Sequence, residues 1–210
     1  MTNRLPPSIA LSVVLTTLTA AWTAAQTPVQ WNFLGHGTEL GGLLGAAVTS
    51  SEMAPMVGGT AGWGINPWVT VEARAAWFAR GEKSRGLGGD VGALVNVVRK
   101  RQVTPYVGLA FGLYRESIDS DARRVSGFYR RRMLQDARGG VVGVRTFTDS
   151  AWRVGAGIGI ARHRNLSLRP EASVTLVHRN GATDAITTFG IRVGWIFEDH
   201  PVTPSVRSHP

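Results

Sequence analysis

The chain of 210 residues contains no cysteine, and no apolar run in it is long enough for a membrane-spanning helix. The missing cysteine excludes disulfide bridges, thiolate chemistry and acylation of an N-terminal cysteine. A helix that crosses a bilayer needs about 20 consecutive apolar residues, so a helical membrane protein is not expected. Acidic residues are also scarce: 14 Asp and Glu stand against 23 Lys and Arg, which gives a formal net charge of +9.

The N-terminus predicts a secretory signal peptide over residues 1–25. Arg4 supplies a positive charge, residues 9–21 form a short apolar stretch, and residues 23–25 are the small residues that precede a cleavage site. The apolar stretch is too short for a membrane anchor, and an uncleaved N-terminal helix is the alternative. We therefore expect secretion to the periplasm, with a mature chain that begins at Gln26.

The abundant feature of the remaining chain is alternation. Eight segments place apolar side chains at every second position, with polar or small residues between them, which predicts β-strands with two different faces. The clearest segment is 68–79, in which Val69 and Val71 alternate with Thr70 and Glu72. The eight predicted strands are 38–48, 55–65, 68–79, 87–98, 105–115, 151–161, 167–178 and 185–197.

The polarity of the two faces predicts a transmembrane barrel. A soluble barrel of the lipocalin type is apolar inside, whereas an outer-membrane barrel is apolar outside and polar inside. Strand 68–79 directs Glu72 and Arg74 to one face, which suits a polar interior. We therefore expect an all-β fold, an eight-stranded antiparallel up-and-down transmembrane β-barrel over 38–197. Residues 26–37 are then a periplasmic N-terminal segment and residues 198–210 a periplasmic tail.

Connection lengths and aromatic residues predict the orientation of this barrel. Short connections near 66–67, 99–104 and 162–166 alternate with longer ones at 49–54, 80–86, 116–150 and 179–184, which favours short periplasmic turns and longer outer loops. Segment 116–150 is the long outer loop, with a helical turn around Phe128 and a strand extension above the membrane. Aromatic girdles are expected at both interfaces: Trp63, Trp68, Tyr106, Trp195 and Phe197 at the periplasmic ends, and Trp77, Phe78, Tyr114 and Trp152 at the outer ends.

Four segments carry a resemblance to a known family. They are Pro105-Tyr106-Val107-Gly108, Gly155-Ala156-Gly157-Ile158-Gly159, residues 165–171 and residues 189–195. Over about 38–197 the chain resembles the small outer-membrane β-barrel proteins of the OmpA/OmpX-like eight-stranded type. The resemblance implies a location in the cell outer membrane and recognition by the barrel-insertion machinery, with Phe197 as the terminal aromatic residue. These segments indicate a fold and not a function.

Inward ionisable residues form the first candidate site. The alternation directs four acids and four bases into the lumen: Glu39, Glu72, Asp90, Glu171, Arg74, Arg153, Arg169 and Arg192. An unpaired charge taken out of water costs several kcal/mol, and eight strands leave a lumen just wide enough for side chains. The balanced set therefore predicts an interior salt-bridge network that plugs the lumen. A narrow conduit, or a carboxylate pair for acid–base chemistry, is the alternative.

The histidines do not favour a metal site or a catalytic site. The five are scattered along the chain, and only His178 is predicted at the outer rim. A lipid-modifying enzyme there would need a hydroxyl, such as that of Ser126 or Ser150, and an orienting acid, such as Asp184. We therefore expect no cofactor, no metal and no enzymatic activity; chemistry on the acyl chains of lipid A at the rim is the alternative.

Arginine residues of the predicted outer loop form the second candidate site. The main ones are Arg123, Arg124, Arg130, Arg131, Arg132 and Arg138. Arginine makes bidentate, always charged contacts with phosphate, and the outer leaflet is rich in lipopolysaccharide phosphates. Outer-membrane lipid and lipopolysaccharide are therefore the expected partners, in a structural or interaction role. Nucleic acid is the other common partner of such a cluster but is not expected in this compartment. A solvated basic loop without a specific partner is the alternative.

Overall fold

The computed structural model of the chain describes the barrel strands and most of their turns. The described residues are 37–49, 53–79, 84–98, 103–119, 128–129, 144–161, 165–179 and 182–197. The predicted signal peptide 1–25, all of the segment 26–37 except Gly37, the tail 198–210 and the six loop arginines lie outside them, as does most of the predicted helical turn. In the described part of the chain, no helix has both the length and the apolar character needed to cross a bilayer.

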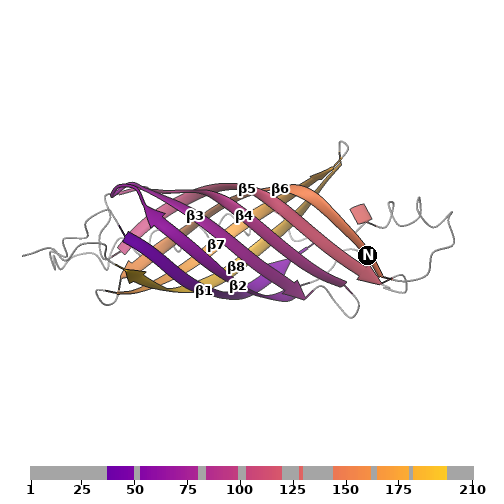
Figure 1. Cartoon of the computed structure of the whole chain (residues 1–210), viewed down its shortest axis with the longest axis horizontal. Coiled ribbons are helices and arrows are strands. Elements are labelled where there is room, and N and C mark those ends of the chain that lie inside the picture. Colours follow the sequence, from indigo (N-terminus) through magenta and orange to yellow (C-terminus); the bar gives the residue numbers. More distant parts are fainter. Residues whose placement is uncertain are drawn as a thin grey trace, which may run out of the picture.

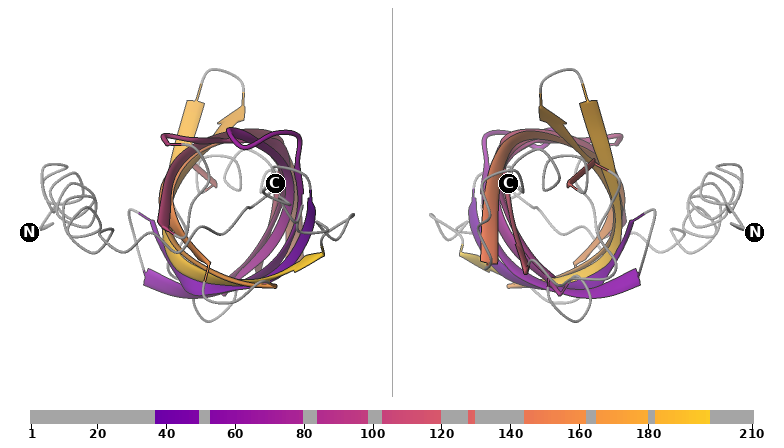
Figure 2. Two further views of the ribbon diagram at one scale, coloured as in Figure 1. Left: turned by 90° about the vertical axis from the view of Figure 1, so that its left-hand side faces the viewer. Right: turned by 90° about the vertical axis from the view of Figure 1, so that its right-hand side faces the viewer.

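Eight strands form the fold, and each pairs antiparallel with its neighbours in the sequence. They are β1 (Gly37–Val48), β2 (Met53–Gly64), β3 (Val69–Ala79), β4 (Ser84–Asn96), β5 (Val103–Asp119), β6 (Val144–Ala161), β7 (Leu166–Arg179) and β8 (Ala182–Phe197). Because β8 also pairs with β1, the sheet closes on itself into a barrel (Figures 1 and 2). The predicted all-β, eight-stranded antiparallel barrel is confirmed, and each predicted strand has its counterpart.

The outside of the barrel is apolar. Every second residue of a strand points outward, and large hydrophobic side chains such as Leu44, Val91 and Leu109 are exposed there. A contiguous apolar surface of this extent is unfavourable in water, whereas it matches the lipid-facing band of a membrane barrel. Exposed Trp63 and Trp195 lie toward one end of this band, and Trp77 and Trp152 toward the other.

We call the end where β1 begins and β8 ends the near end, and the opposite end the far end. At the far end the strands continue beyond the predicted bounds, since β5 and β6 stay paired up to Asp119 and Val144. The connections 49–52, 80–83 and 180–181 are therefore as short as the near-end connections 65–68, 97–102 and 162–165. The expected alternation of short and long connections is wrong, because only the connection 120–143 is long.

The lumen has two chemically different halves. Charged side chains fill its near half, as described below. Its far half holds a buried cluster that we call the apolar chamber: Leu43, Ala47, Met56, Ala76, Phe78, Tyr114, Ile118, Tyr129, Phe147, Ala151, Val177 and Ile186. A polar interior was the expectation, and this half departs from it in part: apolar side chains form the cluster, whereas Glu116, Asp149 and Asp184 are buried at inward positions of the same half.

Three aromatic residues assigned to the girdles belong to the lumen instead. Tyr106, Phe78 and Tyr114 are buried inside the barrel. Phe78 stands an even number of positions from Arg74 on β3, and successive side chains of a strand alternate between its two faces. The parity of the position therefore decides where an aromatic ring points, although its residue type suits an interface.

Candidate functional site

The structure places all eight predicted inward charges in the lumen, and we call this group the ionic layer. Glu72 lies at its centre, where the guanidinium of Arg192 donates to both carboxylate oxygens. Arg153 Nη2 lies 3.4 Å from Glu72 Oε1 and 2.7 Å from Asp90 Oδ1. The Arg192 side chain is only 1% exposed. Its charge is therefore held by fixed carboxylates rather than by water.

Glu171 joins two further strands to this centre. It accepts a hydrogen bond from Arg74 Nη1 at 3.1 Å and a second one from Arg192. The hydroxyl of Tyr106 also donates to it at 3.1 Å. Sequence reasoning missed Tyr106 as a member of the network, although its inward parity on β5 was a usable signal.

A second group of charges closes the near end. Arg169 donates to Glu39 Oε2, and the hydroxyl of Ser167 donates to Glu39 Oε1 at 2.7 Å. The guanidinium of Arg169 also lies 5.8 Å from the centre of the Tyr106 ring, within the range of a cation–π contact. The ion pairs of this layer thus join side chains of β1, β3, β4, β6, β7 and β8 across the lumen.

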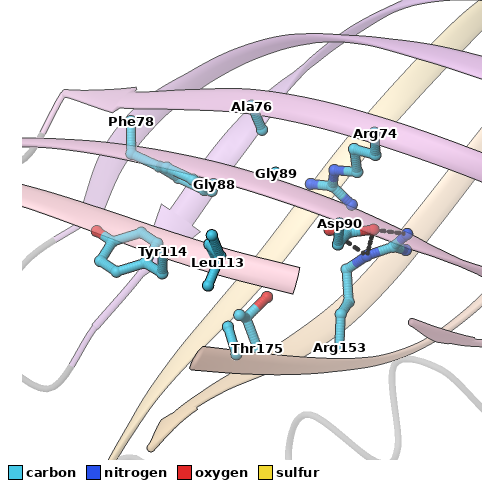
Figure 3. Close-up of a pocket in the computed structure, with 11 residues that line it drawn as sticks. Arg74, Ala76, Phe78, Gly88, Gly89, Asp90, Leu113, Tyr114, Arg153 and Thr175 are labelled. Atoms are coloured by element: carbon cyan, nitrogen blue, oxygen red, sulfur yellow. Dashed lines mark hydrogen bonds and ion pairs between the residues drawn. The ribbon is translucent and has the colours of Figure 1, made fainter. Parts of the chain in front are cut away.

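A small cavity separates the ionic layer from the apolar chamber. Arg74, Asp90 and Arg153 border it on one side, and the rings of Phe78 and Tyr114 border it on the other (Figure 3). Its volume is about 20 Å³, roughly the space that one water molecule requires. The cavity is therefore a junction between the two halves of the lumen and not an open channel.

The groups that a rim enzyme would need are divided between two faces. His178 Nδ1 lies 3.1 Å from the hydroxyl of Thr183, and the Ser150 hydroxyl donates to the main-chain oxygen of His178 at 3.3 Å. These side chains are on the outward face, whereas Asp184 is buried on the lumen side of β8. In the described part of the chain, no group of His, Asp and Glu is placed to hold a metal ion.

Two arginine residues stand on the outward face at the far rim. Arg85 on β4 faces Ser117 on β5, and Arg115 faces Leu87. Both arginines are exposed, and neither has an ion-pair partner among the described residues. Sequence reasoning missed Arg85, because the apolar alternation on β4 begins at Leu87 whereas the strand itself begins at Ser84.

Hydroxyl groups surround these two arginines. Ser117 faces Thr146 on β6, with 3.1 Å between their hydroxyl oxygens, and Arg115 faces Thr148. The apolar band ends one outward position below, at Leu87 and Leu113. Beyond Leu87 and Leu113, the next outward-facing residues of β4 and β5 are therefore arginines, and hydroxyl groups of β6 lie beside them.

Comparison with solved structures identifies barrels of the same architecture. Neisserial surface protein A superposes with a TM-score of 0.57 at 14% identity, over 78% of this chain and 97% of that protein. OprG of Pseudomonas aeruginosa gives a TM-score of 0.52 at 12% identity, over 78% and 97% of the two chains. The N-terminal barrel domain of Pseudomonas aeruginosa OprF gives 0.51 at 14% identity, over 78% and 99%. At such identities the likeness concerns the fold alone.

Sequence comparison identifies the family. No curated protein matches the chain by sequence. The sequence profile of the family described as the outer membrane protein beta-barrel domain matches residues 10–197, which is most of the chain. The family match places the protein in the outer membrane, and the chain belongs to the outer membrane protein beta-barrel family.

Proposed function

We propose that this outer-membrane barrel has a non-enzymatic, structural or interaction role, in which its far rim binds the phosphates of lipopolysaccharide. The observation that carries the proposal is the pair Arg85 and Arg115. Both are exposed on the outward face, directly beyond the apolar band, and neither has an ion-pair partner among the described residues. A cation in this position faces the headgroups of the lipid leaflet, and arginine suits phosphate by charge and by shape.

The register of β4 and β5 brings the two guanidinium groups toward one ligand. Arg85 and Arg115 are diagonal neighbours on one face of the sheet, and such neighbours are about 7–8 Å apart at their Cα atoms. Two arginine side chains are long enough to converge on a single phosphate from that separation. The hydroxyls of Ser117, Thr146 and Thr148 add donors beside them. The arginines predicted in the loop within 116–150 would extend the same cationic surface.

The arrangement around His178 supports a role without catalysis. A nucleophile, a base and an orienting acid must line up for acyl chemistry. The Ser150 hydroxyl is directed to a main-chain oxygen rather than to the imidazole, and Asp184 faces the lumen. The enzymatic alternative would therefore need a different arrangement of these groups.

Charge removal at the rim tests the proposal. We would refold the parent and the Arg85→Gln/Arg115→Gln variant and measure their affinity for lipopolysaccharide at low and at high salt. Hydrogen bonds to charged groups contribute about 1.5–3 kcal/mol, and exposure to solvent reduces that contribution. We expect the double variant to bind roughly tenfold more weakly, which corresponds to about 1.4 kcal/mol. The difference should shrink at high salt, because exposed charges are screened.

The matched control is Arg99→Gln/Lys100→Gln. It also removes two positive charges, but from the near-end connection between β4 and β5. Equal losses in the two double variants would mean general charge attraction and no rim site. Unchanged affinity in the Arg85→Gln/Arg115→Gln variant would refute the role of these two residues.

A further inference from the structure

Among the described residues, the apolar chamber contains one buried side chain that does not come from a strand, and its neighbour Phe128 packs against the cluster. Tyr129 comes from the connection between β5 and β6, whereas the other members belong to strands. It is only 1% exposed, and its ring centre lies 5.6 Å from that of Phe147 and 4.8 Å from that of Phe128. The chamber is thus a space formed by the wall and filled by a phenol ring from outside the wall.

The strand pairing of the barrel does not depend on this ring. The ladder between β5 and β6 is continuous from Val103 and Ile160 to Asp119 and Val144, and Tyr129 takes no part in it. Withdrawal of the ring would leave the pairing intact and free the place that the ring occupies among the chamber side chains. Cavities with mostly apolar walls bind apolar molecules of matching size.

Polar groups border the chamber in two places. On β5 the hydroxyl of the chamber residue Tyr114 donates to buried Glu116, and further polar groups stand at the floor. Arg74 Nη2 lies 3.3 Å from the sulfur of Met56, which is a chamber residue. The small cavity between Phe78 and Arg153 continues the chamber toward the ionic layer (Figure 3). Mostly apolar walls with a few converging polar groups are the usual composition of a small-molecule site.

We propose that the apolar chamber is a binding site for a small monocyclic phenol, and that Tyr129 occupies it as an internal competitor. The side chain of Tyr129 itself defines the ligand class, because a phenol ring already fits against Phe147. An external phenol must displace a tethered ring. Its apparent dissociation constant is therefore raised in inverse proportion to the fraction of molecules from which the ring has left. This site is separate from the phosphate site of the far rim, so the two proposals stand or fall independently.

Two methionines of β2 provide a direct test. Met56 is 3% exposed and lines the chamber, whereas Met53 is 68% exposed on the outside. With ¹³C-labelled methionine methyl groups, we would titrate the parent, Tyr129→Ala and Tyr129→Phe in lipid nanodiscs with p-cresol, the analogue of the tyrosine side chain. Met53 reports any general partitioning of p-cresol into lipid.

The proposal gives a distinct pattern for the three proteins. In Tyr129→Ala the Met56 resonance should shift saturably, with a midpoint at least tenfold below that of the parent. Tyr129→Phe should behave like the parent, because its ring still fills the chamber. Met53 should change equally in all three. The absence of a saturable Met56 shift in Tyr129→Ala would overturn the proposal, and so would equal midpoints in Tyr129→Ala and Tyr129→Phe. Circular dichroism of each protein establishes that the barrel has folded.

Discussion

At the scale of single residues, the contacts of a charged group in the lumen depend on the space beside a glycine. A Cβ at Gly194 would overlap the Glu39 carboxylate and lie 2.7 Å from the Ser167 hydroxyl. The absence of a side chain there allows Ser167, Glu39 and Arg169 to meet. Gly42 points outward instead, and a Cβ there would meet no atom within 4 Å.

These two glycines make a matched pair of variants. Gly194→Ala should destabilise the folded barrel by about 1–3 kcal/mol, the usual cost of overpacking, because the methyl group displaces Glu39 from Ser167. Gly42→Ala should change stability by less than about 0.5 kcal/mol, as at an unconstrained surface position. Urea unfolding of both variants in vesicles measures the difference. Equal losses would mean that the space beside Glu39 is not required.

Residue parity determined more of the candidate site than residue type did. Period-two alternation directs Glu72, Arg153 and Arg192 into the lumen from the sequence alone, and the structure has them there. Which acid meets which base depends on how far each strand is staggered around the barrel. A single sequence does not contain that stagger. The girdle prediction is wrong for Phe78 and Tyr114, because their aromatic character suits an interface whereas their parity directs them into the lumen.

At the scale of elements, the β5–β6 hairpin is the part that the sequence described least well. A membrane strand needs about 9–11 residues, whereas β5 has 17 and β6 has 18. Beyond the apolar band the outward residues become Arg115, Ser117, Thr146 and Thr148, so the apolar signal that marks a strand fades. The ladder continues because its hydrogen bonds join main-chain groups, which are the same in polar and apolar residues.

The connection 120–143 of this hairpin carries a prediction of its own. If Arg130, Arg131 and Arg132 engage lipopolysaccharide phosphates, replacing all three with Gln should weaken the retention of lipopolysaccharide severalfold and leave urea unfolding unchanged, because no strand is altered. The loss should diminish at high salt, since exposed charges are screened over about 8 Å at physiological ionic strength. Retention and salt response equal to those of the parent would remove the loop from the proposed function.

At the scale of the whole molecule, two chemically different layers stand one behind the other in the lumen. The ionic layer joins six strands through buried ion pairs, and the apolar chamber fills the far half. An ion that enters from the far end first meets a mostly apolar layer, in which the buried carboxylates of Glu116 and Asp149 already have hydrogen-bond partners, so losing its hydration there is costly. It then meets fixed charges that are already paired. Each layer opposes ion passage by its own mechanism.

This arrangement predicts a closed barrel that remains closed when one layer is opened. In planar bilayers the parent should give no stable conductance steps. Tyr129→Ala should also give none, because Glu72 and Arg192 still fill the near half. Adding Glu72→Gln to Tyr129→Ala disturbs both layers, and only that double variant should conduct. Stable steps from the parent would establish a conduit. Steps from Tyr129→Ala alone would show that the ionic layer does not seal the lumen by itself, which would leave the tyrosine ring as the principal barrier.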